Sequence, residues 1–242
     1  MPSGIPYVHH IGANLFAKNS VDELLRISNF VTIDDGYAFN YNYIKELLER
    51  GADVLVFVCD NVLSGKLLQK DIILLKVIQA KPFSFLSFGK YRFFIGFLSL
   101  KSRVRLGRMI NRLLIKDNIE LDSCEVGNDF VEYFLPLSLN QLRELKDKGC
   151  RIGWHTSDHK WLRSRKDILL AWADRVHLES ALNSKMEGFA LPYGAPFDLL
   201  DNEMNLIYDV LDCPLYLIER EMYLNLDKPS DKLMFRESAD LL

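Results

Sequence analysis

The fold is decided by the stretch Phe30-Val31-Thr32-Ile33-Asp34-Asp35-Gly36. It starts as an apolar run and then breaks into two carboxylates and a glycine, as a buried strand does when its carboxyl end opens into a polar site. The next apolar run, Val54 to Val58, is continuous, which is typical of a parallel strand covered on both faces. Helical apolar spacing over Tyr41 to Arg50 separates the two runs, so the sequence predicts a right-handed strand–helix–strand unit.

A second polar stretch carries two histidines, in the order His155-Thr156-Ser157-Asp158-His159. Their i, i+4 spacing predicts both imidazoles on one face of a helical turn. One carboxylate with two histidines is a common ligand set for a divalent metal that keeps positions open for water and substrate. The spare carboxylate of the Asp34-Asp35 pair would then be placed to act as a base on that water. We therefore expect the two stretches to meet in space.

Three motifs, in this order along the chain, resemble those of the polysaccharide deacetylases of the NodB-homology type, carbohydrate esterase family 4. The family motif T-F-D-D-G corresponds to Thr32 to Gly36, and the motif H-[ST]-x-x-H corresponds to His155 to His159. A third motif, Y-P-Y-G in one subgroup, corresponds to Leu191-Pro192-Tyr193-Gly194. The resemblance implies an α/β fold of the distorted (β/α)7 type, a TIM-like barrel. It implies one domain over residues 1–242, with a family-atypical insertion at about 61–136.

The resemblance also implies a reaction, the metal-dependent hydrolysis of an N-acetyl group from an amino sugar in a bacterial polysaccharide or its intracellular precursor. Asp35, His155 and His159 would bind the metal, with zinc expected first and cobalt, nickel or manganese as alternatives. Asp34 would take the proton from water, and the backbone N–H of Tyr193 would help to hold the oxyanion.

Two positions depart from the family pattern. Family members often have an arginine in the third motif that orients the base, but Ala190 stands there, and Arg236 is the candidate for supplying that charge. The late histidine that protonates the leaving amine is also missing, because no histidine follows His177. In relatives with a rearranged barrel order this acid comes from the amino-terminal strand, so the resemblance implies His9 as the general acid, with His10 as the fallback.

Composition indicates an ordinary globular protein, with 242 residues, 49% hydrophobic residues and a formal net charge of −3. Overall binding to a polyanion such as nucleic acid is not expected from this charge. The first residues show no basic segment followed by an apolar core, so no signal peptide is expected. The four cysteines show no C-x-x-C spacing and are expected to be reduced thiols. Together these features predict a cytoplasmic protein. Combined with the family resemblance, they imply that it acts on an amino-sugar glycan or on a lipid-linked or nucleotide-linked precursor.

The insertion contains an aromatic segment, Phe83 to Leu100, followed by the basic, amphipathic segment Lys101 to Lys116. One interpretation is peripheral membrane contact through residues 83–116 at the inner face of the membrane. The other is a helix that packs on the barrel and leaves a solvated basic face.

Two alternatives to the deacetylase also stay open: a deformylase of a lipid-linked amino sugar, and a non-catalytic member of the family that binds a glycan or serves as a scaffold.

Overall fold

The structure is a computed structural model that describes residues 5–12, 19–119, 121, 126–162, 164–193, 210–218 and 233–238. By its internal contacts the chain divides into two compact units, one of residues 1–65 and 136–242 and one of residues 66–135. We call the first the barrel unit and the second the insertion unit. The insertion unit begins a few residues later than the boundary predicted from the sequence, because the short helix α3 (Asn61–Ser64) belongs to the barrel unit.

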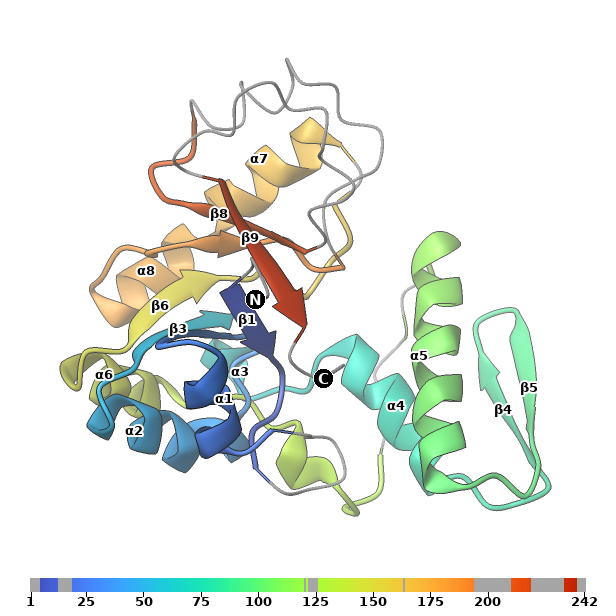
Figure 1. Ribbon diagram of the computed structural model, residues 1–242. Coiled ribbons are helices and arrows are strands. Elements are labelled where there is room, and N and C mark those ends of the chain that lie inside the picture. Colours follow the sequence, from blue (N-terminus) through green and yellow to red (C-terminus); the bar gives the residue numbers. More distant parts are fainter. Residues whose placement is uncertain are drawn as a thin grey trace. The chain divides into compact units, whose positions relative to one another are not determined.

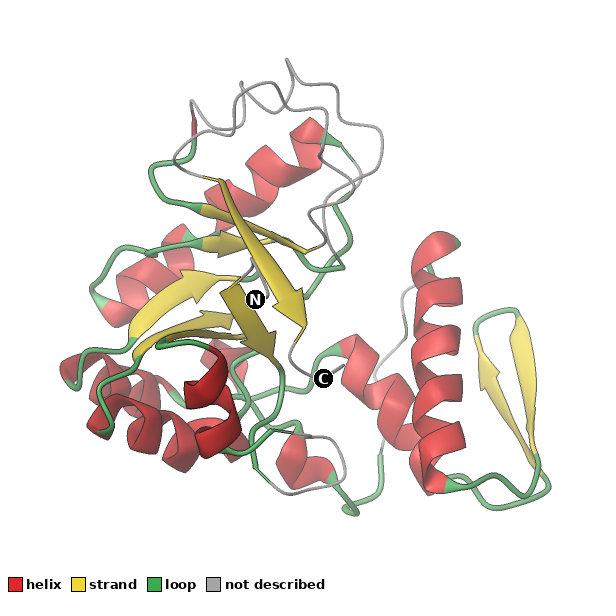
Figure 2. Ribbon diagram, viewed as in Figure 1, coloured by secondary structure: helices red, strands yellow, loops and turns green. Residues whose placement is uncertain are grey.

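Among the described residues of the barrel unit, seven parallel strands close a barrel in the order β1-β2-β3-β6-β7-β8-β9 (Figures 1 and 2). The predicted distorted (β/α)7-type barrel is therefore confirmed. The strands are β1 (Ile5–Val8), β2 (Phe30–Ile33), β3 (Asp53–Val58), β6 (Arg151–Trp154), β7 (Phe189–Ala190), β8 (Leu215–Ile218) and β9 (Leu233–Ser238). The helices of this unit are α1 (Val21–Ile27), α2 (Tyr41–Glu49), α3, α6 (Leu139–Asp147), α7 (Arg165–Asp174) and α8 (Val176–Leu182), with a 3-10 turn at η1 (Ala38–Asn40).

Strand β3 shows why its sequence is apolar throughout. Val54, Val56 and Val58 belong to the large core that also contains buried residues of the surrounding helices. The alternate residues, Leu55 and Phe57, belong to a separate buried cluster with residues of β7 and β8. Both faces of the strand are therefore covered, as expected for a parallel barrel strand.

One helix prediction was wrong. The sequence predicts a single helix over Asp167 to Ser184, but the structure has α7 and α8, separated at Arg175. The backbone N–H of Arg175 donates to the carbonyl of Trp172, three residues back, so the last turn of α7 tightens before α8 begins at Val176. The side chain of Arg175 stays close to both helices, over the ring of Trp172 and paired with Glu179.

The cysteines of the described residues, Cys59, Cys150 and Cys213, are free and buried, as predicted, while Cys124 lies outside the described residues. Burial raises the pKa of the Cys150 thiol to about 12. A thiol in that state is protonated and unreactive at neutral pH, so this cysteine packs as a small apolar residue.

The described residues of the insertion unit form two α-helices and a β-hairpin. Helix α4 (Gln69–Gln79) packs against α5 (Leu100–Lys116), and the hairpin consists of β4 (Ser84–Phe88) and β5 (Tyr91–Ile95). A 3-10 turn, η2 (Val131–Tyr133), follows. The two helices and the hairpin share one small core, formed by Ile73, Val77, Phe88, Ile95, Ile110 and Leu114. The unit therefore has an apolar core of its own.

Helix α5 is the amphipathic helix predicted from the basic segment, but one of its cations is not solvated. Arg103 is buried, and its Nη1 donates to the carbonyls of Ile78, at 2.8 Å, and of Ala80. These carbonyls lie at the C-terminal end of α4, where the last backbone acceptors of a helix have no partner within it. Arg103 therefore caps α4 and belongs to the structure of the insertion unit.

Candidate metal centre

The carboxylate of the site is held by a sharp turn after β2. The N–H of Asp34 donates to the carbonyl of Val8, and the carbonyl of Gly36 accepts from Leu137, so both sides of the turn are fixed. Asp35 and Gly36 both have positive φ, at 68° and 59°. A Cβ added at Gly36 would lie 2.5 Å from Cγ1 of Val58, so only glycine fits this close approach. The Asp-Asp-Gly sequence therefore places Asp35 at the carboxyl rim of the barrel.

The first histidine follows β6 directly. The N–H of His155 donates to the carbonyl of Val58, which continues the pairing of β6 with β3 by one residue. The Nδ1 atom of His155 lies 2.9 Å from the carbonyl oxygen of Ala190. A carbonyl only accepts hydrogen bonds, so Nδ1 carries the proton and Nε2 is left with its lone pair. His155 is thereby fixed in the tautomer that can bind a metal through Nε2.

The second histidine is presented by a loop, and here the prediction of a helical turn was wrong. Thr156 and His159 have φ values of 70° and 57°, in the left-handed region that a right-handed helix does not contain. The N–H of Lys160 donates to the hydroxyl of Thr156, which closes the loop on itself. The two imidazoles still meet, with ring centroids 4.8 Å apart, because the loop folds back rather than continuing as a helix.

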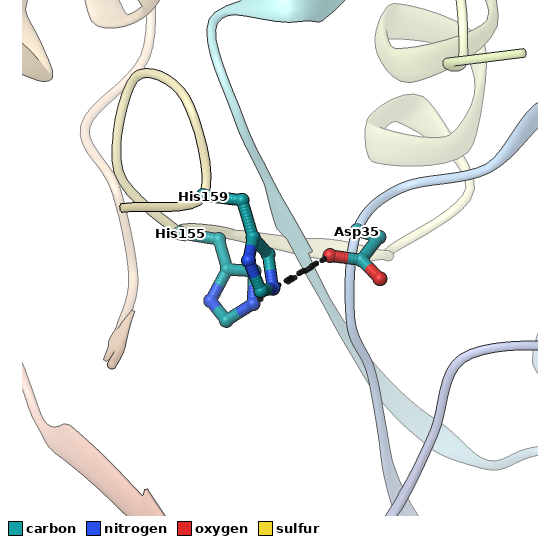
Figure 3. Close-up of side chains that lie close together, drawn as sticks. All are labelled: Asp35, His155 and His159. Carbon is teal, nitrogen blue, oxygen red and sulfur yellow. Dashed lines mark ion pairs between the residues drawn. The ribbon is translucent and has the colours of Figure 1, made fainter. Parts of the chain in front are cut away.

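Asp35, His155 and His159 converge on one point (Figure 3). Nε2 of His155 lies 3.7 Å and Nε2 of His159 lies 3.2 Å from Oδ1 of Asp35. One ligand atom from each residue fits within 4.8 Å of the others, and the residues are only 0%, 2% and 7% exposed. Two nitrogens and one carboxylate oxygen, fixed from two sides and shielded from bulk water, suit zinc or another divalent transition metal. The residues predicted to bind a metal are thus the ones that the fold brings together.

His9 lies beside this set and His10 packs elsewhere. Nε2 of His9 is 3.9 Å from Oδ2 of Asp35, and the His9 side chain is partly exposed. Its backbone is held by Asn40, whose Nδ2 donates to the carbonyl of His9 and whose Oδ1 accepts from the N–H of Ile11. His10 is buried with its ring stacked on Tyr37, at a centroid separation of 4.6 Å.

The structure describes the side chains of only some of the other predicted site residues. Asp34 is buried next to Asp35 at the end of β2. The ring of Tyr193 is nearly perpendicular to that of His159, with centroids 4.6 Å apart, so the third motif reaches the predicted metal ligands. Gly194 lies outside the described residues, and so does the side chain of Arg236, whose backbone is part of β9. The roles predicted for Tyr193 and Arg236 stay predictions.

Three supporting residues were missed by the sequence analysis. Ala190 acts through its carbonyl, which no side-chain pattern reveals. Asn40 orders the His9 backbone from 31 residues away in sequence. Asp60, the residue before α3, accepts a hydrogen bond from Ser157 of the histidine loop, and burial raises the pKa of its carboxyl. Of the eight non-glycine residues with positive φ in the described part of the chain, four lie in the site: Asp35, Thr156, His159 and Tyr193. Such backbone strain is concentrated at functional sites.

The fold and the site define a parallel barrel with a buried Asp-His-His ligand set at its carboxyl rim. No protein-family model matches the chain, and no curated protein matches it. The chain does match solved structures.

The deacetylase PplD from Streptococcus pyogenes, solved in complex with acetate, is similar at 14% identity with a TM-score of 0.52, over 97% of this chain and 91% of that chain. IcaB from Ammonifex degensii gives 16% identity, a TM-score of 0.48 and coverage of 97% and 90%. The deacetylase domain of BpsB from Bordetella bronchiseptica gives 13% identity and a TM-score of 0.42, over 86% of this chain and 72% of that chain. The resemblance drawn from the motifs is thereby confirmed at the level of the fold, which this chain shares with PplD.

Proposed function

We propose that this chain is a metal-dependent hydrolase that removes an N-acetyl group from an amino sugar in a polysaccharide or in its intracellular precursor. The observation that carries the proposal is the buried set of Asp35, His155 and His159, with the tautomer of His155 fixed by the carbonyl of Ala190. The set lies at the carboxyl ends of β2 and β6, the edge at which enzymes with parallel barrels place their catalytic groups. The fold shared with the deacetylase PplD supports the same function.

In this proposal the chain's own residues move two protons. Hydrolysis adds a water oxygen to the acetyl carbonyl carbon and breaks the bond from that carbon to nitrogen, giving acetate and a free amine. A divalent cation bound by Asp35, His155 and His159 would supply Lewis acidity. Asp34 takes the proton from the water, because its carboxylate adjoins the ligand Asp35 and is buried. His9 donates a proton to the leaving amine, a role suited to an imidazole 3.9 Å from Asp35 that is also open to solvent.

Two further roles complete the proposal. The backbone N–H of Tyr193 helps to hold the developing oxyanion, as the contact of its ring with His159 allows. Arg236 supplies the positive charge that orients Asp34, because Ala190 occupies the family's arginine position and has no charge to offer.

A deformylase of a lipid-linked amino sugar uses the same chemistry and is the second candidate. The observation that favours it is the exposed aromatic and basic surface of the insertion unit, which would suit a substrate held at a membrane. No helix in the described part of the chain is long and apolar enough to cross a bilayer. We expect both reactions to take place in the cytoplasm, at or near the inner face of the membrane.

The test is to measure the metal content of the purified protein and to quantify both acetate and formate released from N-acylated amino-sugar substrates. The proposal expects about one transition-metal ion per chain and acetate release that stops when a chelator is added. Formate without acetate would instead establish the deformylase. A metal-loaded chain that binds N-acetylated oligosaccharides and releases neither acid would show that this is a non-catalytic glycan-binding protein.

A further inference from the structure

The insertion unit has an unusual charge. Residues 72–116 contain ten lysines and arginines and no aspartate or glutamate. The whole chain has a formal charge of −3, so the rest of the chain carries −3 − 10 = −13. One 45-residue segment therefore concentrates positive charge in an acidic protein.

The hairpin of this unit has two unlike faces. Leu86, Phe88, Phe93 and Ile95 face the small core of the unit. On the opposite face the pairs are Phe85 with Phe94 and Ser87 with Arg92, and these four residues are exposed. The rings of Phe85 and Phe94 touch, with centroids 5.2 Å apart, and the guanidinium of Arg92 lies 4.2 Å from the centre of the Phe85 ring. The outer face thus presents aromatic rings together with a cation.

Exposed phenylalanines of the described residues all occur in this part of the chain. Phe83 is 71%, Phe85 54%, Phe94 55% and Phe97 85% exposed. Phe83 contacts Phe94, with centroids 6.4 Å apart, so at least three of the rings form one continuous patch. Large apolar side chains gathered on a surface mark an interaction site. We call Phe83, Phe85, Arg92, Phe94 and Phe97 the hairpin patch.

Helix α5 contributes a basic stripe to the same unit. Its exposed residues recur at the spacing of one helix face and comprise Lys101, Arg105, Arg108, Met109, Arg112 and Lys116. Met109 is 55% exposed and is the apolar member of the stripe. Because Arg103 points into the unit and caps α4, the stripe is distinct from the structural cation of this helix.

We propose that the insertion unit binds the surface of an anionic phospholipid bilayer, with the hairpin patch in the interface and the basic stripe against the lipid phosphates. Phenylalanine rings are stabilised where they leave water for the boundary between headgroups and acyl chains. Lysines and arginines are attracted by the negative potential of an anionic leaflet. A single-stranded nucleic acid would also attract cations and rings, but it offers no apolar layer for Phe97 and Met109, which are 85% and 55% exposed. A bilayer therefore suits both the hairpin patch and the basic stripe.

The experiment is co-sedimentation of the full chain with vesicles of phosphatidylcholine alone and with vesicles that also contain phosphatidylglycerol. The aromatic variant is Phe85→Ser/Phe94→Ser, and its control is Leu170→Ser, which is as exposed as Phe94, at 55%, but lies in the barrel unit. The charge variant is Arg105→Glu/Arg112→Glu, and its control is Lys148→Glu/Lys166→Glu, which makes the same change in net charge on exposed lysines of the barrel unit. All altered side chains are exposed, and circular dichroism checks that each variant folds.

The proposal expects binding to the phosphatidylglycerol vesicles and little binding to phosphatidylcholine alone. The charge variant should reduce partitioning at least about 20-fold, at roughly fivefold for each cation lost. The aromatic variant should reduce it about tenfold. The two controls should bind like the parent.

Equal binding by the aromatic variant and the parent would overturn the insertion of the hairpin patch. The proposal would also be overturned if the parent does not bind vesicles but forms a dimer in analytical ultracentrifugation, and the aromatic variant abolishes that dimer. A second copy of the chain would then be what covers the hairpin patch. Binding of the parent to a single-stranded oligonucleotide but not to vesicles would assign the surface to nucleic acid. No substrate is needed in these measurements, so they stand or fall separately from the proposed deacetylase activity.

Discussion

The barrel unit and the insertion unit treat polar and apolar side chains in opposite ways. In the barrel unit apolar strand residues such as Val31 and Val56 are buried, and the titratable groups of Asp34, Asp35 and His155 are buried at the rim. In the insertion unit phenylalanines are left in water, while cations cover one face of α5. Burying a carboxylate has a free-energy cost unless it has a partner, and exposing a large ring has one unless something covers it. The comparison supports the two proposals made above, that the barrel unit holds a metal and that the insertion unit binds a membrane surface.

The largest effect is expected from removing a ligand of the barrel unit. His155→Ala should reduce bound metal from about one ion per chain to less than about a tenth, since one carboxylate and one imidazole make a poor site. Mass spectrometry of the metal measures this. His177→Ala, at an exposed histidine of the same unit, is the control and should keep the metal. Full occupancy in His155→Ala would mean that the cluster is not the metal site.

The two adjacent carboxylates should separate in their effects. Asp34→Asn should keep the metal and lose roughly 10²–10⁴-fold in turnover, because an amide cannot accept the proton of water. Asp35→Asn should lose both metal and turnover. Parallel measurements of metal content and acetate release on the two variants decide between these roles, and parental activity in Asp34→Asn would exclude it as the base.

His9→Ala should have a smaller effect, roughly 10²-fold on turnover with metal content unchanged. This value is the lower end of the roughly 10²–10⁴-fold range for a general acid. It applies because His9 is partly exposed, so a buffer molecule can donate the proton in its place. Added imidazole should therefore restore part of the activity of His9→Ala and none of that of Asp34→Asn. A variant with unaltered turnover would leave the general acid to be found elsewhere.

Substitution of Arg103 in the insertion unit should change the stability of that unit and leave metal binding and turnover unchanged. Arg103→Met should lower the free energy of unfolding of this unit by about 2 kcal/mol, because the carbonyls at the end of α4 lose a charged, buried donor. Lys101→Met, an exposed neighbour on the same helix, should change it by less than about 0.5 kcal/mol. Hydrogen exchange of the α4 amides measures both, and metal content should be unchanged. Similar protection of α4 in the two variants would argue that Arg103 is dispensable.

Several features were determined by the sequence alone. The run Val54 to Val58 forms a strand that is buried on both faces, and its continuous apolar pattern indicates this directly. The run that begins at Phe30 forms the neighbouring strand, with Val31 to Ile33 buried. Asp35, His155 and His159 were predicted as metal ligands because an apolar run breaks abruptly into carboxylates at Asp34 and Asp35, and because three motifs occur in the family's order. The amphipathic helix α5 could also be predicted from the sequence, because its apolar residues recur with the period of a helix.

Only the tertiary structure decided how these groups are held. The i, i+4 spacing of His155 and His159 suggested a helix, but positive φ at Thr156 and His159 closes a loop instead, because contacts across the barrel outweigh local spacing. The carbonyl of Ala190 and the side chain of Asn40 act across 35 and 31 residues, through the closure of the barrel, and leave no local pattern. Arg103 illustrates the same limit in the insertion unit. Its sequence context is that of a solvated cation, and only the packing of α5 on α4 buries it against backbone carbonyls that need a donor.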